Sequence, residues 1–231
     1  MATYKNSYPF GNTVRDGLVL NLDATNIASY SAGSSIWYDT SGNGNNGTLT
    51  NGPTFLQERG RGSIVFDGTN DYVLGSSTFN YTSSTWNCWF NPASLTTAGV
   101  YPRRIMHKSD NSGNNELNLL HSNGTVQWYG WGTSTYLWNV SASGITVNNW
   151  HNATGTHDGN NAYLYLNGRL ASSASYSGSM VSTVPLCIGR VAFTSVAIYT
   201  GSVSVAQIYN RALSSDEVLQ NYTALKTRFG L

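Results

Sequence analysis

The sequence of 231 residues has little charge, little cysteine and no long apolar run. Charged residues make up only 10% of the chain, the net charge is +1, and the basic residues are scattered except for the pair Arg103 and Arg104. Because phosphate backbones are bound by clustered basic side chains, we expect no nucleic-acid partner. Cys88 and Cys187 each lie in an apolar, strand-like run, which favours small buried thiols over a disulfide or a metal site.

The lack of a long apolar run also bears on membranes and export. A helix that crosses a bilayer needs about 20 apolar residues, and the chain has no such stretch. The first ten residues lack the basic and apolar regions of a signal peptide. We therefore expect no membrane partner and no export through a signal peptide.

Glycine, serine, threonine, asparagine and tyrosine are abundant, which is typical of many short strands joined by tight turns. Strand-like runs recur along the chain, as in residues 17–23 and 82–90. The second run is apolar on both faces, with Trp89 opposite its other large side chains, which predicts a central strand. Tyrosine and leucine alternate through residues 162–166 before an Asn-Gly pair, which predicts a strand and a hairpin turn.

No internal repeat, proline-rich linker or shift of composition divides the chain. We therefore predict one all-β domain, an antiparallel β-sandwich that spans residues 17–231 and ends in one short C-terminal helix. Ser214 and Glu217 indicate that helix, because they have the spacing of a capping box. Residues 1–16 lack periodicity and are predicted to form an N-terminal attachment arm.

The loop at residues 37–48 and the hairpin at residues 62–73 concentrate side-chain oxygens, and two interpretations remain open. In the first they hold calcium, because oxygens in the loop alternate at positions one, three, five and seven, as in calcium loops. The candidate metal ligands are then Asp39, Asn43, Asn45 and Asp71. Position twelve is Thr50 rather than a bidentate glutamate, which excludes a helix-loop-helix site. In the second, the asparagines and glycines make a compact turn closed by Asx hydrogen bonds.

Aromatic residues gather in residues 124–138 and suggest a second kind of site. Sugar rings present apolar C–H faces that stack on tryptophan and tyrosine. The candidate ligand-binding residues are therefore Trp128, Tyr129, Trp131 and Tyr136. The alternative is that these aromatics fill the sandwich core or a subunit interface, as alternating aromatics in strands usually do.

Carboxylates give little support to catalysis. Glycoside hydrolysis needs a closely placed carboxyl pair, whereas the glutamates are isolated at Glu58, Glu116 and Glu217, and the last is explained by helix capping. The four histidines show no metal-ligand motif. We predict no enzyme activity and no catalytic residue; a pair of aspartates joined by the fold is the remaining route to one.

Six motifs occur in the order of a known family, at residues 37–47, 66–73, 150–151, 163–168, 188–190 and 208–214. Together they resemble the laminin-G-like, concanavalin-A-like lectin/glucanase jelly-roll domain, and the resemblance covers about residues 17–226. Residues 18–26 and 47–55 are similar to versions found in structural proteins of tailed bacteriophages.

The resemblance implies a jelly roll and a non-enzymatic virion protein on the outer surface of the particle, either a capsid decoration or a fibre component. The implied partners are the major capsid protein or another virion protein, a cell-surface polysaccharide, and further copies of the chain in a homo-oligomer. The alternative is a calcium-assisted, carbohydrate-binding adhesin, although Ser204 stands where relatives often carry an acidic residue. A glycoside hydrolase is a third possibility, but the chain lacks the alternating Glu-Asp-Glu strand of the related glucanases.

Overall fold

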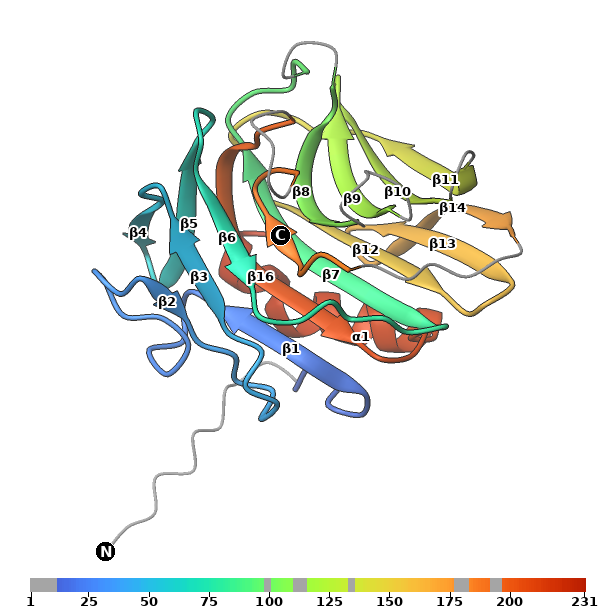
Figure 1. Cartoon of the computed structure of the whole chain (residues 1–231), viewed down its shortest axis with the longest axis horizontal. Helices are drawn as coiled ribbons and strands as arrows, with labels where there is room; N and C mark the ends of the chain where they lie inside the picture. The colour runs from blue at the N-terminus through green and yellow to red at the C-terminus, as the bar shows by residue number, and fades with distance from the viewer. Residues whose placement is uncertain (1–11, 98–100, 110–115, 133–135, 177–182, 192–196) are drawn as a thin grey trace, which may run out of the picture.

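Two eight-stranded antiparallel sheets pack face to face in the computed structural model (Figure 1). The structure describes residues 12–97, 101–109, 116–132, 136–176, 183–191 and 197–231, without the side chains of residues 116 and 117. Sheet A has the spatial order β14 (Arg169–Ser175), β13 (Asn161–Leu166), β12 (His151–His157), β7 (Ser84–Pro92), β16 (Thr200–Tyr209), β5 (Arg61–Asp67) and β4 (Thr54–Glu58), with β1 (Leu18–Asp23) paired to β16. Sheet B has the order β11 (Tyr136–Ser143), β10 (Thr125–Trp131), β9 (Glu116–Ser122), β8 (Arg103–Lys108), β15 (Cys187–Ile188), β6 (Tyr72–Gly75), β3 (Gly47–Thr50) and β2 (Ile36–Trp37).

This architecture confirms the predicted all-β jelly-roll sandwich. The space between the sheets is filled by aromatic and aliphatic side chains, of which Trp37, Trp86 and Trp128 are fully buried. Such large apolar side chains each contribute roughly 1.5–3 kcal/mol or more to folding when they leave water.

The central position predicted for residues 82–90 is also confirmed, because β7 lies between β12 and β16. Trp86, Cys88 and Phe90 face the core between the sheets, whereas Trp89 belongs to a separate cluster on the outer face of sheet A. The strand is therefore covered on both sides, which explains its nearly continuous apolar sequence.

A helix covers that outer face. It runs as α1 (Ser215–Leu225) into the 3₁₀ turn η1 (Lys226–Phe229), and Ser214 and Glu217 form the expected capping box at its start. Trp89 stacks on Phe229 with ring centroids 4.1 Å apart, and on Tyr222 at 5.6 Å. The only part of the chain in α-helical form, among the described residues, is thus held to sheet A by aromatic stacking.

The N-terminal residues that the structure describes lie against the domain. The backbone N–H of Val14 donates to Asn221 Oδ1 at 2.7 Å, and the Gln220 side chain donates to the carbonyl of Asn12 at 2.8 Å. Residues 12–16, which the sequence assigned to the arm, are thus fixed to α1, and residues 1–11 lie outside the described residues. The arm's role in attachment stays a prediction.

In the described part of the chain no helix is long and apolar enough to cross a bilayer.

Candidate functional site

Asp39, the first candidate calcium ligand, uses both carboxylate oxygens to hold its own loop closed. Oδ1 accepts from the backbone N–H groups of Asn21 and Ser41, each at 2.8 Å. Oδ2 accepts from the Ser41 hydroxyl at 2.8 Å and from the backbone N–H of Asn45 at 2.9 Å. This is the arrangement of the compact Asx-bonded turn, and it occupies the oxygens that an ion would need.

The other candidate ligands do not converge on Asp39. Asn43 and Asn45 donate their amide N–H groups to backbone carbonyls of β1, Asn45 to Val19 at 2.7 Å. Asp71 lies at the opposite end of the β3–β6 ladder, because that ladder pairs Gly47 with Gly75 at the loop end and Thr50 with Tyr72 beside Asp71. The candidate ligands therefore fall into two separate groups, and the described residues contain no cluster of three or more His, Cys, Asp or Glu suited to a metal ion.

Asp71 has an environment of its own. It is buried, and burial raises the pKa of its carboxyl, although Oδ2 accepts from the backbone N–H of Asp67 at 3.1 Å. The neighbouring Asp67 is exposed, and the backbone N–H of Thr69 lowers the pKa of its carboxyl. Asp67 and Asp71 are thus two nearby acids of a tight hairpin, and these hydrogen bonds close that hairpin.

The predicted aromatic group divides between the two faces of β10. Trp128 is fully buried in the core beside Trp86, with ring centroids 5.7 Å apart, and its indole N–H donates to Thr156 O at 3.3 Å. Trp128 therefore presents no exposed ring to a sugar. This corrects its grouping with the other three aromatics: side chains alternate along a strand, so residue 128 faces away from residues 129 and 131.

Tyr129, Trp131 and Tyr136 do lie together on the outer face of sheet B. Tyr136 meets Trp131 edge-to-face at 4.5 Å and Tyr129 at 5.4 Å. Arg104 donates from Nη2 to the Tyr129 hydroxyl at 2.7 Å, and only Tyr136 in this group is largely exposed. These residues form an aromatic platform, and sugar binding there stays a prediction.

The histidines and cysteines are buried, and burial favours their uncharged forms. Burial lowers the pKa of His107 to about 3, and of His121 and His157 to about 4, so the imidazoles are neutral at neutral pH. Burial raises the pKa of the Cys187 thiol to about 12, which leaves no thiolate nucleophile. Both cysteines are free thiols, as the sequence predicted.

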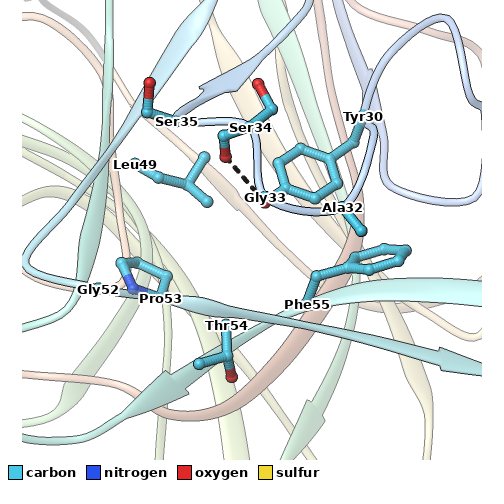
Figure 2. Close-up of a pocket in the computed structure, with 10 residues that line it drawn as sticks. All are labelled: Tyr30, Ala32, Gly33, Ser34, Ser35, Leu49, Gly52, Pro53, Thr54 and Phe55. Carbon is cyan, nitrogen blue, oxygen red and sulfur yellow. Dashed lines mark hydrogen bonds between the residues drawn. The ribbon is translucent and has the colours of Figure 1, made fainter.

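A cavity that the sequence did not point to opens where the edge strands of the two sheets meet. It has a volume of about 440 Å³ and lies between β4 at the edge of sheet A and, on the side of sheet B, β3 and the segment that precedes β2. We call it the edge pocket; its lining is Tyr30, Ala32, Gly33, Ser34, Ser35, Leu49, Gly52, Pro53, Thr54 and Phe55 (Figure 2). None of these ten side chains is charged.

Two aromatic rings form one wall of the edge pocket. Tyr30 and Phe55 have ring centroids 5.1 Å apart, and the Tyr30 hydroxyl donates to the Ser34 carbonyl at 2.9 Å, which fixes that ring. Figure 2 shows the two rings on one side of the cavity and Leu49 and Pro53 on the other. Ser35 and Thr54 are exposed on the rim. The pocket thus combines an apolar ring face with hydroxyl groups.

Comparison with known proteins agrees with the sandwich. The chain matches the family described as the Concanavalin A-like lectin/glucanases superfamily over residues 66–219, a range that begins after the edge pocket's residues. No curated protein sequence matches it.

Among solved structures, the chain is similar to the binding domain of botulinum neurotoxin serotype D, with a TM-score of 0.71 at 15% identity over 91% of this chain and 52% of that one. It is similar to the binding domain of Paraclostridial Mosquitocidal Protein 1, with a TM-score of 0.69 at 19% identity over 90% and 52%. A third is domain 4 of AbnA, a GH43 extracellular arabinanase from Geobacillus stearothermophilus solved with arabinotriose, with a TM-score of 0.70 at 14% identity over 89% and 98%. The chain spans about half the length of the toxin domains.

Proposed function

The chain belongs to the concanavalin A-like lectin/glucanase superfamily, and on that premise we propose that it is a non-enzymatic binding domain that takes a neutral sugar unit in the edge pocket. The observation that carries the proposal is the uncharged lining of this pocket, with Tyr30 and Phe55 on one wall and the exposed side chains of Ser35 and Thr54 on the rim. A sugar ring stacks its C–H face on an aromatic ring and bonds its hydroxyls to neighbouring polar groups.

The size and stiffness of the pocket fit a short oligosaccharide end rather than a protein. Its volume of about 440 Å³ is in the range of small-ligand sites. Pro53 is buried, and the Tyr30 hydroxyl is tied to the backbone, so the wall is formed before a ligand arrives. Such preorganisation lowers the entropy cost of binding.

The two glutamates whose side chains the structure describes are held in ion pairs, which favours binding without hydrolysis. Glu58 pairs with Arg61 at 3.0 Å, and Glu217 is bound to Arg211 at 2.6 Å, which lowers the pKa of the Glu217 carboxyl to about 2. Glu217 is therefore not poised as a proton donor at neutral pH. The structural neighbours also favour binding: two are toxin binding domains, and one arabinanase domain was solved with a trisaccharide.

The test is calorimetric titration with arabinotriose, a neutral probe taken from that neighbour, and with a panel of neutral glycans. We expect Phe55→Ala to weaken binding about tenfold or more, because it removes one of the two rings of the aromatic wall. Trp131→Ala is the matched control, since it removes an aromatic from the platform on sheet B. If only Trp131→Ala loses binding, the sugar binds at that platform and not in the edge pocket. Release of reducing sugar during the titration would overturn the proposal that the domain is non-enzymatic.

We further propose that the domain acts on the outer surface of a tailed-phage particle, bound to the major capsid protein or another virion protein. This part rests on the sequence motifs shared with phage structural proteins. Many copies on one particle, or a homo-oligomer, raise the avidity of weak sugar contacts without any new contact. Cryo-electron microscopy of the native particle should place density for this chain on its outside; particles that lack the chain would contradict the proposal.

Calcium stays a proposal for the loop around Asp39. Since an ion would have to replace four hydrogen-bond donors to that carboxylate, we expect weak affinity, with a dissociation constant of about 10⁻³ M. About 10 mM calcium would then stabilise the fold by about 1.4 kcal/mol.

Thermal unfolding of the native chain and of Asp39→Ala, each with calcium and with EDTA, tests this. A calcium shift lost in Asp39→Ala supports the site. A native chain that does not respond to calcium, with Asp39→Ala less stable in EDTA by about 2 kcal/mol, would show that Asp39 acts only by closing the turn.

A further inference from the structure

A second cavity, of about 420 Å³, lies on the outer face of sheet A. It is enclosed by β1, β16, the end of the C-terminal helix and residues 12–15, and β1, β16 and α1 lie together in the lower part of Figure 1. We call it the helix-side cavity. It shares no lining residue with the edge pocket.

The floor of the helix-side cavity carries two side-chain amides in fixed orientations. Gln207 is 2% exposed, and its Nε2 donates to Asn21 Oδ1 at 3.0 Å. On its other side, Gln207 Oε1 accepts from Asn87 Nδ2 at 2.9 Å, and Asn87 Oδ1 accepts from Asn152 Nδ2 at 2.8 Å. This row of amides crosses four strands of sheet A, so the groups that face the cavity are held before any ligand enters.

Apolar groups complete the floor. Val205, Ala224 and Leu225 line the cavity and belong to the cluster around Trp89, so they are supported from behind. An amide pair beside an apolar patch suits a compact molecule that has hydroxyls and an aliphatic C–H face.

The lining of the helix-side cavity has a net positive charge, which favours an anionic ligand. Arg228 binds both oxygens of Asp23 at 2.9 Å, and these side chains are 19% and 14% exposed, so the two charges offset each other. Arg15 also lines the cavity, is exposed, and makes no ion pair with any described carboxylate. The lining therefore carries one uncompensated positive charge, whereas the edge pocket carries none.

We propose that the helix-side cavity binds a sugar carboxylate, with the carboxylate beside Arg15 and the ring hydroxyls on the amides of Asn21 and Gln207. A carboxylate accepts short, charge-assisted hydrogen bonds from a guanidinium, and fixed amides can donate to and accept from hydroxyls. The domain then has a site for acidic sugar units on sheet A that is separate from its neutral edge pocket.

The experiment compares D-glucuronate with D-glucose by ligand-observed NMR and calorimetry, using the full chain. Both are measured in Phe55→Ala, so that binding in the edge pocket does not contribute. We expect glucuronate to bind about tenfold or more tightly than glucose, and its affinity to fall with added salt. Equal affinities would overturn the proposal.

Three variants locate the site. Arg15→Gln is expected to weaken glucuronate binding about tenfold. Asp23→Asn keeps an oxygen to accept from the backbone N–H of Thr25, removes the charge that offsets Arg228, and should tighten binding. Arg169→Gln changes the net charge by the same amount as Arg15→Gln but lies on β14, at the far edge of sheet A, and should have no effect.

Equal weakening by Arg15→Gln and Arg169→Gln would show non-specific attraction and overturn the site, as would weaker binding in a folded Asp23→Asn. If glucuronate binds as expected but Phe55→Ala does not weaken binding of the neutral probe, the edge-pocket proposal is wrong. The proposal for the helix-side cavity would still hold.

Discussion

Buried histidines set how this fold responds to acid. The folded-state pKa of His107 is about 3, and those of His121 and His157 are about 4, each lowered chiefly by burial from an ordinary value near 6.5. Below about pH 6.5 these histidines are therefore protonated in the unfolded chain while they stay neutral in the folded chain. The free energy of unfolding should be full above that pH and fall by about 1.4 kcal/mol per pH unit for each histidine on the way down to about pH 4.

His121 offers the sharpest test of this acid response. Its ring lies between Phe90 and Tyr199, and neither ring nitrogen has a hydrogen-bond partner among the described residues. His121→Leu should therefore keep or raise stability at neutral pH and remove about one third of the three-histidine slope below it. Urea unfolding at several pH values measures this, and an unchanged slope would show that His121 is not a neutral core residue.

At the scale of elements, the C-terminal helix depends on its first turn. Ser214 Oγ accepts from the Glu217 backbone N–H at 3.3 Å, and the Glu217 carboxylate accepts from the Ser214 backbone N–H at 2.9 Å. Ser214→Ala should lower the free energy of unfolding by about 1 kcal/mol, because it removes this cap. Ser215→Ala is the matched control, because Ser215 is exposed and makes no cap bond.

Denaturant unfolding monitored by tryptophan fluorescence would report this loss, since α1 holds Tyr222 against Trp89. Equal destabilisation by the two serine variants would contradict the capping role. A loss larger than about 2 kcal/mol in Ser214→Ala would indicate that α1 and the outer face of sheet A unfold together.

The elements that could be predicted from the sequence are those whose signals are local. The capping box at Ser214, the Asn167-Gly168 turn with φ values of 50° and 75°, and the two-faced strand β7 each depend on residues close in sequence. The two faces of β10 could also be predicted, because successive side chains of a strand point to opposite faces and Trp128 is followed directly by Tyr129. Aromatic density alone does not distinguish the two faces, and the alternation of side chains places Trp128 in the core, away from Tyr129 and Trp131.

The edge pocket could not be predicted in the same way. Tyr30 and Phe55 are 25 positions apart and belong to segments at the edges of different sheets, so their rings meet only through the packing of one sheet on the other. The helix-side cavity is less local still, since Asn21 meets Gln207 across 186 positions. Long-range pairing of strands decides both sites, and a single sequence carries no direct sign of it.

For the whole molecule, two separate cavities imply two ligands that bind independently. The edge pocket and the helix-side cavity share no lining residue and differ in charge, so a neutral oligosaccharide and a sugar carboxylate should not compete. At about ten times its dissociation constant, each ligand stabilises the fold by about 1.4 kcal/mol, and together they should give about twice that. Thermal unfolding of the native chain with arabinotriose, glucuronate and both measures the sum.

The single variants then assign each half of that sum. Phe55→Ala should reduce the arabinotriose shift to about 0.4 kcal/mol or less and keep the glucuronate shift, because tenfold weaker binding leaves the ligand near its dissociation constant. Arg15→Gln should do the reverse, and the double variant should show only the two reduced shifts. A combined shift no larger than the greater single one would mean that both ligands use one site. Because acidic polysaccharides carry neutral and carboxylated units side by side, additive shifts would also show how one domain can hold both kinds of unit at once, with multivalent display adding avidity.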